Sequence, residues 1–198
     1  MIINDSQKFV FVAVPKTATT TIHEYFRKDI YISDRDDWLQ TKYHYPLDMI
    51  LKENPISSNY FKFGFARNPW DRMVSSWLDF SKSEGHLLVW SQNLPKDFNS
   101  FEDFVINLAN TSWSEELHFL PSYSYLKGVD FAGKYENLNE DFKKVLARLN
   151  HSVFDILNLP RQRKTKRTQY REYYTNQKMI DSVASYFKDD IKHYGYEF

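Results

Sequence analysis

The chain has 198 residues, with 26 basic and 26 acidic side chains and no cysteine. Its length predicts one domain over residues 1–198, and its zero formal net charge gives no global field that would attract nucleic acid or an anionic membrane. The absence of cysteine excludes disulfides, thiolate metal sites and a cysteine nucleophile.

The amino-terminal residues and the glycine content exclude further classes. Residues 1–8 carry polar and acidic groups where a signal peptide would need a long apolar region. No apolar stretch approaches the roughly 20 residues that a membrane span requires, so we expect a cytoplasmic protein without a membrane partner. Only five glycines are present, which argues against a glycine-built nucleotide loop.

The first predicted elements are a strand and the helix that follows it. Residues 9–14 are apolar without interruption, which is typical of a strand covered on both faces in a parallel sheet. From Thr20 onward, Ile22, Tyr25 and Phe26 recur at helical spacing. Between these elements lies Pro15-Lys16-Thr17-Ala18-Thr19-Thr20-Thr21. Amides at a helix start together with a lysine favour binding of an anion, whereas the alternative is a threonine-capped turn with a solvated lysine.

A second strand-to-helix junction follows at residues 60–78. Asn68 fits an N-cap, Pro69 the first helical position and Asp71 the third, where a carboxylate suits the helix dipole. Arg67 lies between the predicted strand and helix, which is where α/β proteins bind ligands. Ser75 lies two turns further along this helix, and by itself it could equally be a small residue at a helix contact.

Further elements are predicted along the rest of the chain. Helices are expected over residues 101–109, 138–149 and 176–193, and a strand over residues 129–135. Strands that alternate with helices predict an α/β layered fold with a mainly parallel central sheet flanked by helices.

Together the two junctions closely resemble the signatures of sulfotransferases that use 3′-phosphoadenosine 5′-phosphosulfate (PAPS). The segment from Pro15 to Thr20 resembles the family's 5′-phosphosulfate loop, and the segment from Arg67 to Ser75 resembles its 3′-phosphate site. The pattern is most similar to the carbohydrate sulfotransferase branch, and residues 118–121, 130–138 and 194–198 also resemble it. The resemblance implies a three-layer fold like that of the P-loop NTPases.

The resemblance also implies a set of residues that bind the donor. The 5′-phosphosulfate would be bound by Lys16, Thr17, Ala18, Thr19, Thr20 and Thr21, and the 3′-phosphate by Arg67 and Ser75. Ala18 stands where a glycine is common in the family, so it would be strained if this position needs a positive φ. In the basic run 161–167, Arg163 and Lys164 are the candidates for the adenosine end of the donor.

The implied chemistry is in-line transfer of a sulfuryl group to a hydroxyl, with 3′-phosphoadenosine 5′-phosphate (PAP) as the product and no metal. Lys16 would stabilise the leaving phosphate, and a base that titrates near neutrality would activate the acceptor. His44, between the two signatures, is the candidate base, and His118 is the second. The acceptor is expected to be a small hydroxyl compound or a saccharide.

Two other functions fit parts of this pattern. A P-loop kinase would have a similar fold, but its loop needs glycines and its magnesium needs an acidic residue at a strand end, where this chain has Ala66. A non-catalytic protein that binds an anionic nucleotide or a sulfated glycan would keep the phosphate contacts and lack a competent base. Nucleic-acid binding would depend on residues 161–167 alone and is not expected.

Overall fold

The computed structural model describes residues 1–26, 44–81, 98–152 and 167–198. The chain divides into two compact units, and each unit combines two separate stretches of sequence. The first unit contains residues 1–67 and 122–163, and the second contains residues 68–121 and 164–198. The single domain over residues 1–198 stays a prediction, and each unit is considered by itself below.

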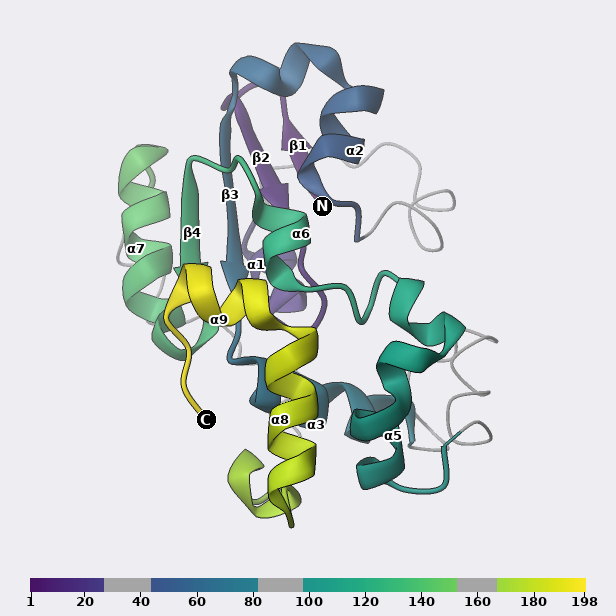
Figure 1. Ribbon diagram of the computed structural model, residues 1–198. Helices are drawn as coiled ribbons and strands as arrows, with labels where there is room; N and C mark the ends of the chain where they lie inside the picture. The colour runs from purple at the N-terminus through teal and green to yellow at the C-terminus, as the bar shows by residue number, and fades with distance from the viewer. Residues whose placement is uncertain (27–43, 82–97, 153–166) are drawn as a thin grey trace. The chain divides into compact units, whose positions relative to one another are not determined.

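A four-stranded sheet with the order β1-β2-β3-β4 forms the centre of the first unit (Figure 1). Its strands are β1 (Ile2–Asn4), β2 (Phe9–Val12), β3 (Phe61–Ala66) and β4 (Phe131–Lys134). β2 pairs with β3 and β3 with β4 in parallel, whereas β1 runs antiparallel to β2. The expectation of a mainly parallel sheet is therefore wrong, because the sheet is mixed.

The antiparallel edge strand follows from the tight turn between β1 and β2. Residues 5–8 form this turn, in which Lys8 adopts a left-handed φ of 55° and Asn4 Oδ1 accepts a hydrogen bond of 2.9 Å from the Gln7 amide. A turn of this length joins only antiparallel neighbours, since a parallel connection needs a crossover of a dozen or more residues. The sequence pattern of β2 gave no sign of this partner strand.

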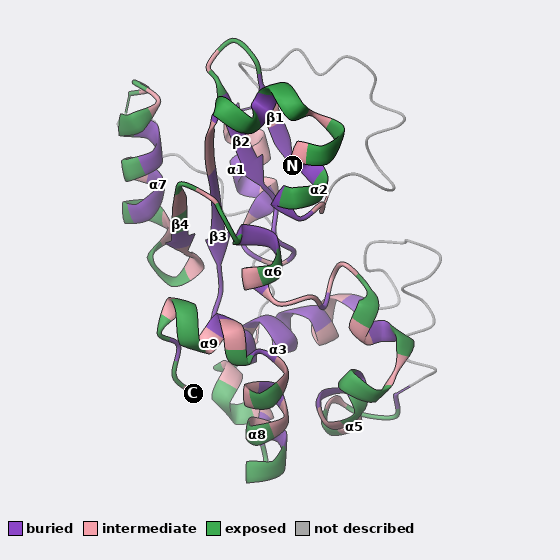
Figure 2. Cartoon of the chain, turned by 45° about the horizontal axis from the view of Figure 1, so that its top comes forward, coloured by how far each residue is buried: buried purple, intermediate pink, exposed green. Residues whose placement is uncertain are grey.

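One face of the sheet carries the aromatic core of the first unit. Successive side chains of a strand point to opposite faces, so alternate residues of β2 and β3 share a face. The core phenylalanines of these strands are Phe9, Phe11, Phe63 and Phe65. They are fully buried and pack against α1 (Thr19–Phe26) and α7 (Leu138–Arg148). In Figure 2, β2 and the later part of β3 lie in the buried colour.

The opposite face is covered by α6 (Ser122–Leu126), with α2 (Leu47–Glu53) beside it. Gly64 on β3 allows this approach. A Cβ atom at Gly64 would lie 2.4 Å from Leu126 Cδ2 and 2.8 Å from the carbonyl oxygen of Val12. A side chain here would clash with the backbone of β2 and displace the Leu126 side chain, so glycine suits the close contact between β3 and α6.

The described part of the second unit is helical. It contains the helices α3 (Pro69–Phe80), α5 (Phe101–Asn107), α8 (Gln177–Tyr186) and α9 (Lys188–Tyr194). α5 packs against both α3 and α8, and the rings of Trp77 and Phe104 stack with centroids 5.4 Å apart. The Trp70 indole nitrogen donates to the carbonyl oxygen of Ile180 at 3.1 Å, which fixes α3 to α8.

The predicted helices and strands are present, with changes at their ends. The helix predicted over 176–193 breaks at Phe187 into α8 and α9, and the one predicted over 101–109 ends at Asn107 before a 3-10 turn, Leu108–Asn110. The short helices α2 and α6 and the 3-10 helix η1 (Pro55–Asn59) were not expected from the sequence. Across the ranges described above, no helix is long and apolar enough to cross a membrane.

Candidate active site

Three parallel strands of the first unit end at the same edge of the sheet. Because β2, β3 and β4 run in parallel, the residues that follow them share this edge (Figure 1). These residues are the loop 13–18 after β2, Arg67 after β3 and Tyr135 after β4. The candidate site of the first unit is therefore assembled by strand pairing from distant parts of the sequence.

The loop after β2 contains two residues with left-handed backbone conformations. Lys16 has φ 66° and Ala18 has φ 65°, so the strain anticipated for Ala18 is present. Ala18 accepts the first hydrogen bond of α1, from the amide of Ile22 at 3.2 Å, and the amides of a helix's first turn point out of its N-terminal end. Left-handed residues in such a turn direct neighbouring amides toward one concave side, which suits an anion.

The threonines of this loop differ in what they can offer a ligand. The Thr17 side chain is fully buried, and its hydroxyl donates to the carbonyl oxygen of Val14 at 2.9 Å. Thr17 could therefore contact an anion through its amide, whereas its hydroxyl stabilises the turn. Thr19 and Thr21 are buried and Thr20 is half-buried at the start of α1.

Arg67 connects the other two strand ends to this loop. Its Nη1 donates to the carbonyl oxygen of Lys16 at 2.8 Å, and its guanidinium carbon lies 4.1 Å from the centroid of the Tyr135 ring. Arg67 is only 6% exposed. Its charge is thus held in a nearly dry position directly beside the candidate anion loop.

His44 lies at the end of β2, near the same loop. Its ring is half-buried, and its Nδ1 is 2.6 Å from the carbonyl oxygen of Ala13, the residue that follows β2. In the first unit, Arg67 thus contacts the backbone of Lys16, and His44 contacts the backbone of Ala13, three residues before Lys16.

The turn that carries Tyr135 is fixed by a carboxylate on α7. Asp141 accepts hydrogen bonds from the Lys134 amide at 2.8 Å, the Asn137 side chain at 3.2 Å and the Lys144 ammonium at 2.7 Å. Burial alone would raise the pKa of Asp141, but the bonds from Lys144 and the Lys134 amide outweigh burial and lower it. Asp141 therefore remains ionised and holds the end of β4 in place.

The second unit contains the other half of the predicted motif. Asn68 caps α3 as predicted, because its side chain accepts from the Asp71 amide at 3.2 Å and donates to the carbonyl oxygen of Glu197 at 2.9 Å. Ser75 lies on α3 and is 9% exposed. The predicted pair for the 3′-phosphate is thus divided, with Arg67 in the first unit and Ser75 in the second.

The basic run and His118 are the remaining candidates from the sequence. Arg163 and Lys164 lie outside the described residues. Arg167 pairs with the Asp71 carboxylate in the first turn of α3, which accounts for one charge of the basic run. The His118 ring packs edge-on against Phe80 with centroids 5.3 Å apart, as expected for a structural histidine.

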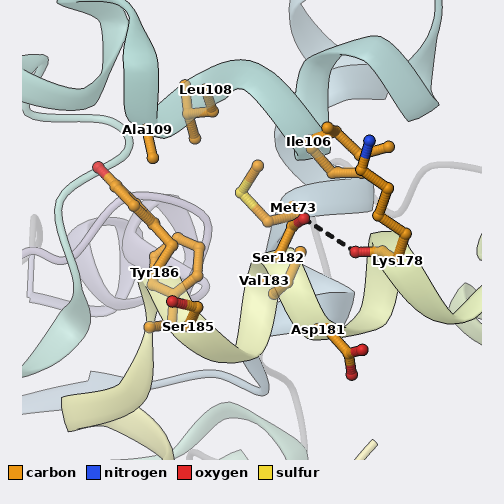
Figure 3. Close-up of a pocket in the computed structure, with 12 residues that line it drawn as sticks. Met73, Ile106, Leu108, Ala109, Lys178, Asp181, Ser182, Val183, Ser185 and Tyr186 are labelled. Carbon is orange, nitrogen blue, oxygen red and sulfur yellow. Dashed lines mark hydrogen bonds between the residues drawn. The ribbon is translucent and has the colours of Figure 1, made fainter.

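The second unit also contains a cavity of about 700 Å³ between α3, α5 and α8. Met73 and Leu108 contribute apolar side chains, and Lys178, Ser182 and Tyr186 lie around it in Figure 3. Of the predicted donor-binding and catalytic residues that the structure describes, none lines this cavity. Among the described residues, no group of three histidine, aspartate or glutamate side chains could hold a metal ion.

The fold is α/β, and the start of α1, Lys16 and Arg67 lie at one edge of its sheet, a set of groups that suits an anionic ligand. The profile of the sulfotransferase family matches residues 1–197, and the chain belongs to this family. An uncharacterized protein of Archaeoglobus fulgidus is 34% identical to it over 100 residues, which cover 48% of this chain and 71% of that protein. The family match supports sulfuryl transfer in general.

Proposed function

We propose that this protein transfers a sulfuryl group from PAPS to a hydroxyl of a carbohydrate or polyol acceptor. The observation that carries the proposal is the loop at residues 15–20, where two left-handed residues precede the first turn of α1. The donor set suits a phosphosulfate, because amides, hydroxyls and an ammonium bind its oxygens without a metal.

The residues of the loop after β2 fit two tasks in such a transfer. The Lys16 ammonium would neutralise charge on the oxygen that bridges sulfur and phosphorus as that bond breaks. The first-turn amides of α1, with the Thr19 and Thr20 hydroxyls, would orient the group to be transferred. When bound, the donor supplies the sulfuryl group and leaves as the bisphosphate. Catalysis would then come mainly from positioning and charge stabilisation.

His44 is the proposed base for the acceptor hydroxyl. Since a carbonyl oxygen can only accept, the contact with Ala13 assigns the proton of the neutral ring to Nδ1. Nε2 is then the nitrogen that can take the acceptor's proton while the hydroxyl oxygen attacks sulfur. Arg67 and Ser75 are proposed to bind the 3′-phosphate, with Arg163 and Lys164 at the adenosine end.

The test compares thermal unfolding of the full chain with PAP and with ATP plus magnesium. A ligand at 100 times its Kd stabilises the native state by about 2.7 kcal/mol, which raises Tm by roughly 5–10 °C for a chain of this size. We expect this shift with PAP. A shift with ATP–magnesium and none with PAP would overturn the proposal in favour of a kinase.

A transfer assay then separates an enzyme from a binding protein. The chain is incubated with PAPS carrying radioactive sulfur and a panel of mono- and oligosaccharides and simple polyols. Labelled saccharide or polyol is the expected product. Binding of PAP with no transfer to any member of a broad hydroxyl panel would instead favour a non-catalytic protein that binds nucleotides.

A further inference from the structure

The contact between Arg67 and Tyr135 has no part in the proposed chemistry. The guanidinium lies over the ring face at 4.1 Å, within the range of an energetically significant cation–π interaction. The same guanidinium donates to the Lys16 carbonyl oxygen at 2.8 Å. One buried charge therefore joins an aromatic ring to the backbone of a left-handed residue in the candidate anion loop.

Strand register places these groups beside one another. Ala66 pairs with Lys134 across β3 and β4, so the next residues of these parallel strands, Arg67 and Tyr135, are neighbours at the sheet edge. The bond from the Lys134 amide to Asp141 fixes the backbone immediately before Tyr135. The ring thus has a fixed position from which it can restrict the long Arg67 side chain.

We propose that Tyr135 is a positioning residue for the anion loop. The face of its ring holds the Arg67 guanidinium against the Lys16 carbonyl oxygen, and this bond keeps Lys16 in its left-handed conformation. The amides that follow Lys16 then remain turned toward the side where an anion would bind. The effect on ligand affinity rests on the proposed function, whereas the effect on the loop does not.

The proposal assigns the role to the ring face and not to the phenol hydroxyl. It can therefore be tested with two variants of opposite expectation. Tyr135→Phe keeps an aromatic face over Arg67, and Tyr135→Leu keeps apolar volume without a π system. Phe61→Leu is the matched control, because Arg148 lies 5.4 Å from the Phe61 ring at the other end of β3.

The first measurement is amide hydrogen exchange of residues 16–20 in the protein without ligand. Tyr135→Leu should accelerate exchange there about fivefold, as expected for loss of a cation–π contact to a half-buried ring. Tyr135→Phe and Phe61→Leu should stay within about twofold of wild type. The affinity for PAP, measured by calorimetry, should fall about fivefold in Tyr135→Leu only.

Several outcomes would overturn the proposal. Wild-type exchange in a folded Tyr135→Leu protein would remove the positioning role, and equal loss in Tyr135→Phe would transfer the role to the hydroxyl. If Tyr135→Leu does not fold, NMR of the wild-type protein tests the proposal. The proposal requires cross-relaxation between the Tyr135 ring and the Arg67 side chain, and its absence would overturn the proposal. If the wild-type protein binds no PAP, the proposed function is wrong. Hydrogen exchange and NMR would still test the positioning role of Tyr135.

Discussion

The Nδ1 atom of His44 lies 2.6 Å from the carbonyl oxygen of Ala13, the first residue after β2. This bond fixes the ring at the strand end that also leads into the Lys16 loop. It also selects the tautomer in which Nε2 is free of a proton, which is the form that a general base requires. The relationship joins residues 31 positions apart in the sequence.

Replacement of His44 tests its role as a base. Loss of general base catalysis typically lowers kcat by 10²- to 10⁴-fold, and we expect a loss in this range for His44→Ala, measured by sulfuryl transfer. His118→Ala is the control, because the His118 ring packs against Phe80, and its kcat should stay near wild type. Retained turnover in His44→Ala would remove His44 from the mechanism.

Replacement of Ala18 by glycine should stabilise the protein, whereas replacement of an alanine with ordinary backbone angles should destabilise it. At φ 65°, glycine relieves a left-handed strain of about 1–2 kcal/mol and adds unfolded-state entropy worth about 0.5–1 kcal/mol. The free energy of unfolding in urea should therefore rise by about 0.5–1 kcal/mol in Ala18→Gly. The control Ala132→Gly, within β4, should lower it by a similar amount, and equal destabilisation by both changes would contradict the prediction.

The neighbouring serines of α3 should behave differently toward PAP. A hydrogen bond to a charged group contributes about 1.5–3 kcal/mol, so Ser75→Ala should weaken PAP binding about 10- to 100-fold in calorimetry. Ser76 is fully buried, and its hydroxyl has no hydrogen-bond partner among the described residues. Ser76→Ala should leave the affinity unchanged and raise stability by about 1 kcal/mol. Equal affinity losses would point to a disturbed helix.

The buried pair of Arg72 and Asp190 should be far more important for stability than an exposed pair. Arg72 Nη1 lies 3.9 Å from Asp190 Oδ2, and Arg72 Nη2 donates to the carbonyl oxygens of His118 and Leu120 at 3.1 and 2.7 Å. Arg72→Met leaves a carboxylate in a site with no exposure, which should lower the free energy of unfolding by about 3–5 kcal/mol.

Two further variants complete this test by urea unfolding. Asp190→Asn in the Arg72→Met background removes the buried charge and should restore part of the lost stability. Lys143→Met breaks the exposed pair with Glu140 and should change stability by less than about 1 kcal/mol. A similar small effect for Arg72→Met would show that the buried pair adds little to stability.

Asp141 should make stability depend on pH. Its pKa is lowered in the folded state, so the ionised carboxylate contributes to the free energy of unfolding at pH values above the ordinary pKa of 3.8. This contribution is lost as the pH falls through the pKa of the folded state. Asp141→Asn should lower the free energy of unfolding by about 1–3 kcal/mol at pH 7. The difference from wild type should vanish in acid, and one that persists at pH 2 would contradict an ionic role. Glu140→Gln, on the same helix, is the exposed control.

The sequence identified those parts of the fold in which a residue acts on its own neighbours. The cap of α3 is one case, since Asn68 binds the amide of Asp71 three residues later. The strand β2 and the helix α1 are others, because their hydrophobic spacing is a local property. The predicted strain at Ala18 also depends on local backbone conformation, and the φ of 65° at this residue confirms it.

Pairings across long stretches of sequence could not be predicted in this way. The antiparallel partner β1 has only three residues, too few to give a periodic pattern. Tyr135 was visible in the motif at residues 130–138, but nothing in that motif indicated that its ring would lie over Arg67. The bond from Arg67 to Lys16 spans 51 residues.

The sequence alone determined the family and the chemical types at the site: a lysine, hydroxyls, an arginine and a candidate histidine. These are properties of residue identity and spacing, which short motifs carry intact. Only the tertiary structure decided that β2, β3 and β4 end together, so that Arg67 reaches the Lys16 carbonyl and His44 the Ala13 carbonyl. Parallel strand pairing and burial set these contacts. Hydrogen bonds and packing depend on which groups are close in space, and separation along the sequence does not give that.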